Sequence, residues 1–313
     1  MVNELINVLI IAIYATVAMM IGILFMGIGR KIVARVHNRV GPPIYQGFID
    51  IAKLILKKTN ITHGWIYDLA LLFSITGIVL TILFLPIGGV KLLSTEGDAF
   101  LVLYLLAIPA LGFALGAGAS GNPNSAIGVM RALVMMLSYE LPFVISMVAL
   151  MIYYDTTSIA EIVASQYGKW AILIPPFAIS AAVADMALQG MLMEAPFDIP
   201  IAPHEIASGP MAEFGGKHLG SLMIYKAGTI VAYTTLFVDL FLGGGVVMKG
   251  GIVADVVNFI VWFILIFLVF TLSLLINTSF PRFRIEQAFK FYWKYEAVLA
   301  IIALVWVYWM VIS

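Results

Sequence analysis

Long apolar runs separated by short polar segments dominate the sequence. A helix needs about 20 mainly apolar residues to cross the hydrocarbon core of a bilayer. Eight runs have this length, and the pattern predicts that each is a transmembrane helix. They cover roughly residues 3–28, 69–88, 100–118, 126–152, 171–192, 223–247, 252–279 and 291–313. We therefore predict an all-α integral membrane protein, one polytopic membrane domain over residues 1–313, with both chain ends on the same side.

Basic residues are unevenly divided between the two sides that eight spans define. Of the 17 Lys and Arg residues, 14 fall on the side of the two large loops, 29–68 and 193–222. Because cytoplasmic loops are enriched in Lys and Arg, we expect these loops in the cytoplasm and both termini outside, in the cell membrane. The first 30 residues lack a basic start and a small-residue cleavage site. We therefore expect the opening run to be a retained span rather than a signal peptide.

Composition agrees with a membrane protein and limits the chemistry of the chain. Hydrophobic residues make up 63% of the sequence and the mean hydropathy is +1.07, whereas soluble domains are about 45–50% apolar. With no Cys, the chain has no thiolates to ligate an Fe–S cluster. None of the four His residues forms a helical His-x3-His pair, so we expect no bound metal or haem in this chain. The zero net charge gives no reason to expect a nucleic-acid partner.

The first large loop contains a short amphipathic segment, YQGFIDIAKLILKK at residues 45–58. Its apolar residues recur at helical spacing, and its charged residues gather on the opposite side. The segment is too short and too charged to span a bilayer, so we predict a helix that lies along the membrane surface. One interpretation is an ordinary interfacial helix. The other is a roof over a cavity, with Asp50 and Lys53 turned inward.

The second large loop, Met191–Gly216, is the most polar interruption of the apolar pattern. It contains four prolines, His204 and four carboxylates: Glu194, Asp198, Glu205 and Glu213. Crowded carboxylates share protons, so their titration belongs to the group. A solvated acidic loop is one interpretation. The other, favoured by the interleaved Pro and Phe residues, is a stiff segment that faces a polar cavity, with Arg30, Arg35 and Arg39 of the first loop as ionic partners.

Glu140, Asp185 and Asp239 are acidic residues that fall inside predicted spans. An ionisable group deep in a span costs about 2.5–3.5 kcal/mol on the insertion scale, so each is a functional candidate. Glu140 lies in the middle of the fourth span and Asp185 in the middle of the fifth, and we expect both to pass or hold protons, with a structural buried acid as the alternative. Asp239 lies near Gly243–Gly245, which is predicted to be a turn, so we expect Asp239 to be solvated at the outer interface.

In three blocks the sequence resembles the membrane-embedded H subunit (subunit 1) of proton-pumping NADH:quinone oxidoreductase, respiratory complex I. It also resembles the corresponding subunits of energy-converting membrane-bound [NiFe] hydrogenases and related ferredoxin-linked, sulfur-reducing complexes. The blocks are Arg35-Val36-His37-Asn38-Arg39-Val40-Gly41-Pro42 with Asp50 and Lys53, then Arg131-Ala132 with Ser138-Tyr139-Glu140, and finally Pro196-Phe197-Asp198 through Glu205 with Ser208-Gly209 and Glu213-Phe214.

The resemblance implies a non-catalytic or shared-site subunit of an oxidoreductase complex. Such a subunit anchors a cytoplasmic arm and couples its electron transfer to H⁺ or Na⁺ translocation. The resemblance assigns proton or ion coupling to Glu140, Asp185, Asp198, Glu205 and Glu213. It assigns docking, or the wall of the quinone chamber, to Arg35, Arg39, Asp50, Lys53, Arg131, Glu194 and His204.

The implied partners are hydrogenase-large-subunit-like and Fe–S chains in the cytoplasm, and small and antiporter-like subunits in the lipid bilayer. These partners would carry the Fe–S clusters and, in a hydrogenase-type complex, the NiFe centre. The terminal acceptor stays open between protons, a sulfur compound and quinone.

Departures from the quinone-reducing pattern favour the hydrogenase-type and ferredoxin-linked relatives. Two Glu positions of the usual PFDL-x-E-x-E-x-E-L loop hold Ile201 and Pro203, and the usual Arg two residues before Pro196 is Glu194. Gly29 and Met135 also replace polar residues of the pattern. A quinone-chamber subunit remains one alternative. An independent secondary ion transporter is another, although the two halves show no paired broken helices.

Overall fold

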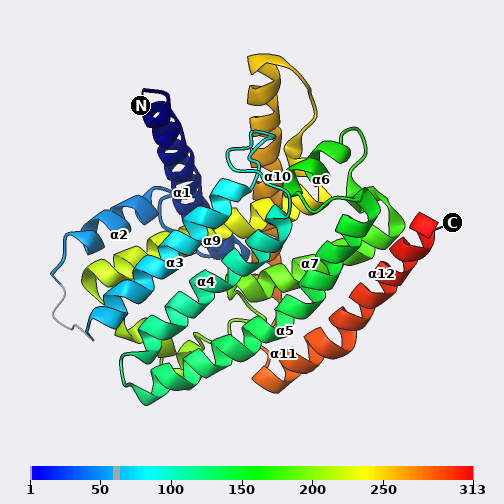
Figure 1. The fold of residues 1–313 in the computed structure, drawn as a ribbon. Helices are drawn as coiled ribbons and strands as arrows, with labels where there is room; N and C mark the ends of the chain where they lie inside the picture. Colours follow the sequence, from blue (N-terminus) through cyan, green and yellow to red (C-terminus); the bar gives the residue numbers. More distant parts are fainter. Residues whose placement is uncertain (1, 59–63, 313) are drawn as a thin grey trace. The chain divides into compact units, whose positions relative to one another are not determined.

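The computed structural model describes residues 2–58 and 64–312, with side chains from residue 8 onward. The secondary structure of this part of the chain consists of helices joined by turns and loops, with a single isolated bridge between Ile87 and Val90 (Figure 1). The longer helices are α1 (Val2–Val36), α2 (Gln46–Ile55), α3 (Trp65–Phe84), α4 (Asp98–Gly118), α5 (Pro123–Tyr154), α7 (Pro175–Leu192), α9 (Gly216–Phe241), α10 (Gly251–Ser279) and α12 (Ala297–Ile312). The shorter ones are α6 (Ile159–Ser165), η1 (Ala171–Leu173), α8 (Pro203–Ile206), η2 (Gly209–Glu213), η3 (Gly243–Gly245), α11 (Ile285–Phe291) and the π-helical turn η4 (Tyr292–Glu296).

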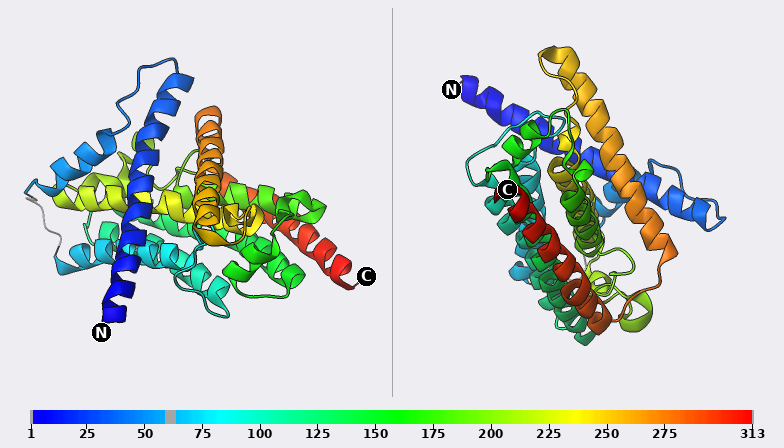
Figure 2. Two further views of the ribbon diagram at one scale, coloured as in Figure 1. Left: turned by 90° about the horizontal axis from the view of Figure 1, so that it is seen from above. Right: turned by 90° about the vertical axis from the view of Figure 1, so that its right-hand side faces the viewer.

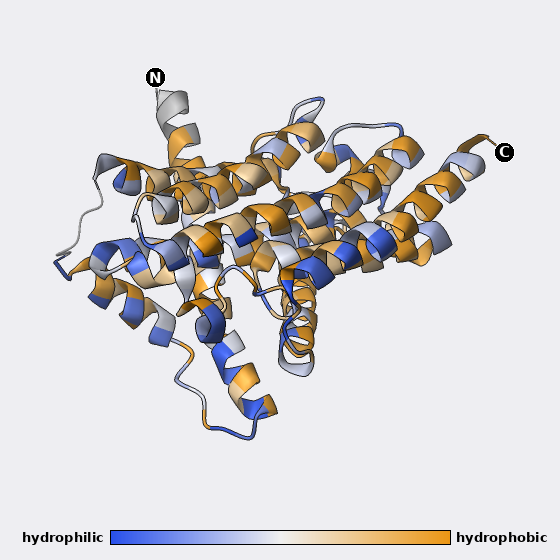
Figure 3. Cartoon of the chain, turned by 90° about the horizontal axis from the view of Figure 1, so that it is seen from below, coloured by the Kyte–Doolittle hydropathy of each residue, from blue (hydrophilic) through white to orange (hydrophobic). Residues whose placement is uncertain are grey.

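Seven helical stretches of the described chain are long and apolar enough to cross a membrane. They are Val8–Val36, Trp65–Phe84, Asp98–Gly118, Pro123–Tyr154, Gly216–Phe241, Gly251–Ser279 and Ile285–Ile312. Figure 3 shows the long helices mostly in the apolar colour, while polar residues concentrate in short helices and connections. An integral membrane protein is therefore supported by length and composition.

The fifth predicted span corresponds to α7, which is not among these seven helices. α7 has 18 residues and contains two prolines, Asp185 and Gln189, which lower its hydropathy. The count of eight spans therefore stays a prediction. A helix is present where the surface helix was predicted, α2, but its place at a membrane surface is also still a prediction.

Two helices extend beyond the spans predicted for them. α1 continues to Val36 rather than ending near residue 28, and α9 begins at Gly216 rather than near residue 223. Both extensions contain charged or polar residues that the structure supplies with partners. Arg30 binds Asp50, and the buried His218 binds Asp68. Because these partners come from other helices, the helix ends could not be read from local polarity.

The described chain forms two compact units. Unit 1 comprises Met1–Leu83, Leu105–Met130 and Pro200–Ala232. In this unit α1, a single long helix in both views of Figure 2, approaches α9 very closely: a Cβ on Gly22 would lie 2.1 Å from the carbonyl oxygen of Ala227. Small residues allow such close backbone approach between membrane helices. Rings also stack in unit 1, where the Tyr67 and Phe214 centroids are 4.9 Å apart.

Unit 2 comprises Phe84–Tyr104, Arg131–Ile199 and Tyr233–Ser313. Within it α7 and α12 lie side by side, and α7 also contacts α10 (Figure 1). The turn predicted at Gly243–Gly245 is confirmed, and all three glycines have positive φ values of 60–74°. Such angles favour glycine over residues that carry a Cβ.

Candidate functional site

The polar segment after α7 is a folded structure rather than a loose loop. Met193 ends α7 in the left-handed conformation, the Ala195–Pro196 peptide is cis, and α8 and η2 follow. The apolar side chains of Phe197, Ile199, Ala202 and Ile206 are at most 5% exposed. The interpretation as a fully solvated acidic loop is therefore wrong. The segment is also divided: residues up to Ile199 belong to unit 2 and those from Pro200 to unit 1.

In unit 2 the two acidic residues of this segment bind the region where α10 ends. Arg282 holds Asp198 in a two-pronged ion pair, with Nε 2.7 Å from Oδ1 and a second bond from Nη2 to Oδ2. The side-chain amide of Asn277 donates to Glu194 at 2.6 Å. Paired charged hydrogen bonds of this kind are both strong and directional. Asp198 thus binds Arg282 rather than a basic residue of the first loop, where its partner was predicted.

In unit 1 the second half of the segment binds the ends of α3 and α5. Asn122 donates to the Glu213 carboxylate at 2.5 Å, and the Tyr67 hydroxyl donates to the Glu213 backbone carbonyl at 2.9 Å. His204 and Glu205, on α8, are exposed within this chain. Their positions are compatible with contact to another subunit.

A His–Asp pair in unit 1 was not predicted from the sequence. His218 is buried and its Nε2 bonds to Asp68, which is more than half exposed. The His218 ring also meets Tyr67 edge to face, with centroids 4.7 Å apart. The two residues are 150 positions apart, so no local spacing indicated this pair.

The first loop places Asp50 against α1. Arg30 Nη1 donates to Asp50 Oδ2 at 3.0 Å, and Gln46 Nε2 donates to Oδ1 at 2.7 Å. The Gln46 hydrogen bond, followed by the Arg30 interaction, holds the pKa of Asp50 below its ordinary value. Lys53 is exposed within this chain, and so are the two other basic candidates of the loop, Arg35 and Arg39.

Acidic residues inside the helices of unit 2 have no basic partner among the described residues. Glu140 lies half-buried in α5, and Asp185 in α7 is 8% exposed, with its Oδ1 buried and without a hydrogen bond. Glu296, at the end of the π-helical turn η4, is 6% exposed. Glu296 was not predicted as a site residue, although it is an ionisable residue inside the apolar run 291–313.

Asp239 was predicted wrongly. It is fully buried near the end of α9, and neither carboxylate oxygen has a hydrogen-bond partner in the described part of the chain. The Gln166 amide donates to the backbone carbonyls of Asp239 and Leu240 rather than to the carboxylate. α6 and the turn η3 lie against each other in this region, and Val163 and Gly244 close over the side chain that was expected to meet solvent.

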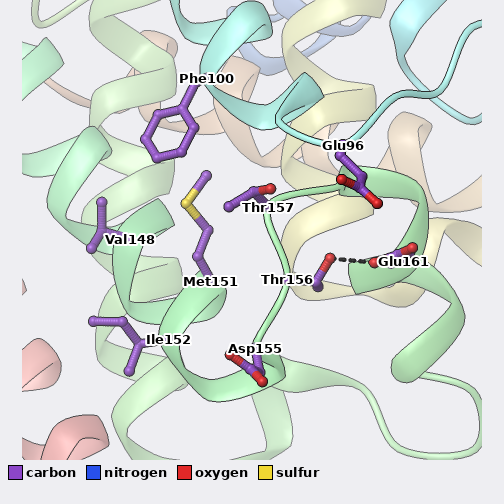
Figure 4. Close-up of a pocket in the computed structure, with 9 residues that line it drawn as sticks. All are labelled: Glu96, Phe100, Val148, Met151, Ile152, Asp155, Thr156, Thr157 and Glu161. Carbon is purple, nitrogen blue, oxygen red and sulfur yellow. Dashed lines mark hydrogen bonds between the residues drawn. The ribbon is translucent and has the colours of Figure 1, made fainter.

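Unit 2 also contains a recess of about 520 Å³ between α4, α5 and α6 (Figure 4). Glu96, Asp155 and Glu161 give it three carboxylates, and Thr156 donates to Glu161. Phe100 and residues of α5 form its apolar wall. Within residues 2–58 and 64–312, no cluster of three or more His, Asp or Glu side chains could hold a metal ion, so this recess lacks a metal-binding arrangement.

Comparison with known proteins identifies the family of this chain. The NADH dehydrogenase family matches residues 8–308. The chain belongs to this family. The H subunit of the NADH-quinone oxidoreductase of Bacteroides fragilis is 30% identical over 319 residues, covering 96% of this chain and 88% of that protein. The corresponding protein of Phocaeicola vulgatus is 29% identical over 309 residues, covering 93% of this chain and 85% of that protein.

A solved structure is similar over nearly the whole chain. It is a subunit of the membrane-bound sulfane sulfur reductase, an archaeal respiratory membrane complex. The sequence identity is 40%, the TM-score is 0.90, and the match covers 96% of this chain and 99% of the other. The family predicted from the three motif blocks is thus confirmed, and so is a relationship to sulfur-reducing membrane complexes. Relatives of the chain are subunits of multi-subunit respiratory complexes.

Proposed function

We propose that this chain is the membrane anchor and coupling subunit of a multi-subunit respiratory complex. It would cross the cell membrane eight times, with α7 as the fifth span, both termini outside and α2 along the cytoplasmic surface. Electron transfer in a docked cytoplasmic arm would drive H⁺ or Na⁺ translocation through antiporter-like membrane subunits. The placement of acidic groups in the chain supports this role.

The observation that carries the proposal is the presence of Glu140 and Asp185 inside unit 2 helices without a basic partner among the described residues. A carboxyl in such a place costs about 2.5–3.5 kcal/mol on the insertion scale. A subunit that served only as an anchor would gain nothing from this cost. A subunit that passes protons needs groups whose charge can change, so the two carboxyls fit a coupling role.

Acidic side chains of the polar segment that are held by hydrogen bonds fit the docking part of the same role. Asp198 is held by Arg282, and Glu213 by Asn122, so the backbone of the segment is tied to helices of each unit. A movement or charge change imposed by a docked subunit would therefore be transmitted to helix ends. Exposed groups that could contact such a subunit are His204, Glu205, Arg35, Arg39 and Lys53.

Partner subunits would supply the redox centres. Thiolates hold Fe–S clusters, and this chain has no Cys, so the clusters and a NiFe centre, if the complex is a hydrogenase, would lie in the cytoplasmic arm. The similarity to the sulfane sulfur reductase favours an arm of the sulfur-reducing type. The similarities to NADH-quinone oxidoreductases favour the second candidate, a quinone-chamber subunit.

Glu140→Gln in the reconstituted whole complex tests the coupling role. We expect electron transfer to change by less than about twofold while ions translocated per electron fall about tenfold, because the variant cannot exchange a proton. Glu161→Gln, an exposed acid of the same unit, is the matched control and should behave as wild type. Full translocation by the Glu140 variant would remove Glu140 from the path. Reduction of a quinone analogue, blocked by chamber inhibitors, would instead identify the quinone-type complex.

A further inference from the structure

A cavity of about 270 Å³ in unit 2 is lined by the loop that follows α3, by α6 and by the start of α10. Its wall carries three charged side chains: Lys91 of that loop, Lys249 just before α10, and Asp255 on α10 itself. In the proposed eight-span arrangement the outer side has three basic residues, Lys91, Lys169 and Lys249. Two of these three therefore line one small cavity.

The loop that carries Lys91 is held against α10 by a tight turn. Ile87 and Val90 exchange two backbone hydrogen bonds of 3.1 Å. Between them Gly88 has a φ of 59°, and a Cβ there would lie 2.9 Å from the backbone nitrogen of Phe259 in α10. A residue with a side chain would not allow this approach. Lys91 directly follows the turn, so its backbone position is set by the contact with α10.

Lys249 is held by hydrogen bonds to its neighbours and by an aromatic ring. The buried Asn258 of α10 accepts hydrogen bonds from the backbone N–H groups of Val247 and Met248, at 2.9 and 3.0 Å. It also donates to the Met248 carbonyl at 2.9 Å. Lys249 is the next residue, and its Nζ lies 4.2 Å from the centroid of the Tyr167 ring. The negative face of the ring stabilises a cation in this position.

The charges around the cavity favour a ligand with one negative charge. No side chain caps the N-terminus of α10, whose N-cap residue Gly250 also lines the cavity, and this end of a helix attracts anions. Neither lysine forms a salt bridge within the described residues. Two ammonium groups and the Asp255 carboxylate leave one formal positive charge. A phosphodiester has one negative charge, whereas a phosphate monoester carries about −1.5 to −2 at pH 7.

The surroundings of the cavity indicate where such an anion is abundant. α3 and α10 are both long and apolar enough to span a membrane, so the loops at their ends lie near the lipid headgroups. Ile252 and Val253, in the first turn of α10, are 83% and 73% exposed. Exposed apolar side chains beside a basic cavity suit a lipid, whose acyl chains contact the apolar residues while its phosphate enters the cavity.

We propose that this cavity binds the phosphodiester headgroup of an anionic membrane lipid, and that Lys91, Lys249 and the N-terminus of α10 hold the phosphate. A bound lipid joins the loop after α3 to the start of α10, because its phosphate contacts both. The inference goes beyond the proposed function and does not depend on it, since the site uses none of the residues assigned to coupling or docking.

Photo-crosslinking to the whole purified complex tests the site. The probe is phosphatidylglycerol with a diazirine near the start of one acyl chain, mixed at increasing mole fraction into phosphatidylcholine nanodiscs that hold the complex. Mass spectrometry of crosslinked peptides should place the probe on the first turns of α10. Lys91→Gln and Lys249→Gln should each raise the probe fraction for half-maximal crosslinking about fivefold, the usual contribution of one lysine to anionic-lipid binding. Lys169→Gln, at an exposed lysine that does not line the cavity, should crosslink as wild type.

Two further substitutions separate charge recognition from packing. Lys249→Arg keeps the positive charge and should crosslink nearly as well as wild type. Asp255→Asn removes the negative group of the cavity and should lower the half-maximal probe fraction. Unchanged crosslinking in both glutamine variants, or equal loss in Lys249→Arg and Lys249→Gln, would overturn the headgroup site. A wild-type complex without crosslinks on α10 would overturn it as well.

Competition distinguishes the lipid from other anions. Unlabelled phosphatidylglycerol should displace the probe, and inorganic phosphate at constant ionic strength should not. Displacement by inorganic phosphate would assign the cavity to the free ion and overturn the lipid. A carbodiimide crosslink from Lys91 or Lys249 to a carboxyl group of another subunit would show that an acidic protein segment fills the cavity, and it would also overturn the proposal.

Discussion

Replacing Gly190 by alanine tests whether α7 depends on the tyrosine hydroxyl that η4 supplies. An added Cβ at Gly190 would lie 2.6 Å from Tyr139 Cδ1 and 2.8 Å from the Tyr292 hydroxyl oxygen, closer than Cβ contacts in real structures. Tyr139 and Tyr292 are both buried, so neither ring can move into solvent. The substitution must therefore displace one ring or separate the helices.

The expected loss of stability follows from two contributions. Overpacking of a filled interior costs about 1–3 kcal/mol. Displacing the Tyr292 hydroxyl from the Met186 carbonyl leaves a buried polar group without its partner, which costs about 1–3 kcal/mol more. Together these amount to about 2–6 kcal/mol, so the melting temperature should fall by about 4–12 °C, at about 2 °C per kcal/mol for a protein of this size.

Thermal unfolding of the purified complex at one fixed scan rate measures this effect. Gly118→Ala is the control, because an added Cβ there has no neighbour within 4 Å, and it should melt at or slightly above the wild-type temperature. Tyr292→Phe removes the hydroxyl that the new Cβ would strike. Combined with Gly190→Ala, it should therefore give a defect smaller than the sum of the two single defects. A Gly190→Ala protein that melts within about 1 °C of wild type would refute the packing argument.

Two further predictions concern fixed charges outside the spans. Arg282→Ala should lower the free energy of unfolding by about 1–3 kcal/mol, because it leaves the part-buried Asp198 without its two-pronged partner. Arg282→Lys should restore only part of the lost stability. Unfolding scans that find Arg282→Ala as stable as wild type would contradict this prediction. Asp50→Asn should destabilise by about 0.5–1 kcal/mol near pH 7, since hydrogen bonds from Gln46 and then Arg30 keep the folded pKa of Asp50 below its unfolded value. That contribution is complete above the unfolded pKa and is lost as the pH falls through the lower, folded pKa. The melting difference between variant and wild type should therefore shrink on acidification, and a difference that grows would contradict the assignment.

The positions of most helices were predictable because an apolar run long enough to cross a bilayer must satisfy its own backbone hydrogen bonds, which a helix does. The ends of α1 and α9 were not predictable, because each continues through polar residues that are satisfied by side chains from elsewhere in the sequence. His218 is an example: its partner Asp68 lies on α3, 150 residues away. A polar residue therefore marks a helix end only when no other element supplies its partner.

For the same reason, some residues of the candidate site were predictable but their partners were not. The motif blocks selected Asp198 and Glu213, and the structure ties both to helices through Arg282 and Asn122. The identity of these partners depends on contacts across 84 and 91 residues, which no spacing rule contains. The prediction for Asp239 was wrong for a different reason. Its nearness to a glycine turn indicated exposure to solvent, but the turn itself packs over the carboxyl group.

The structure separates the acidic residues of this chain into two classes with different physical roles. Asp50 and Asp198 are each held in an ion pair by an arginine. Asp185 and Glu296, inside the helices of unit 2, have no basic partner among the described residues. A carboxylate bound to arginine changes its protonation state only if the ion pair breaks, whereas an acid without a cation changes state whenever a proton can reach it. The first class therefore suits the attachment of a docked subunit and the second suits the movement of protons, the two tasks that the proposed function requires.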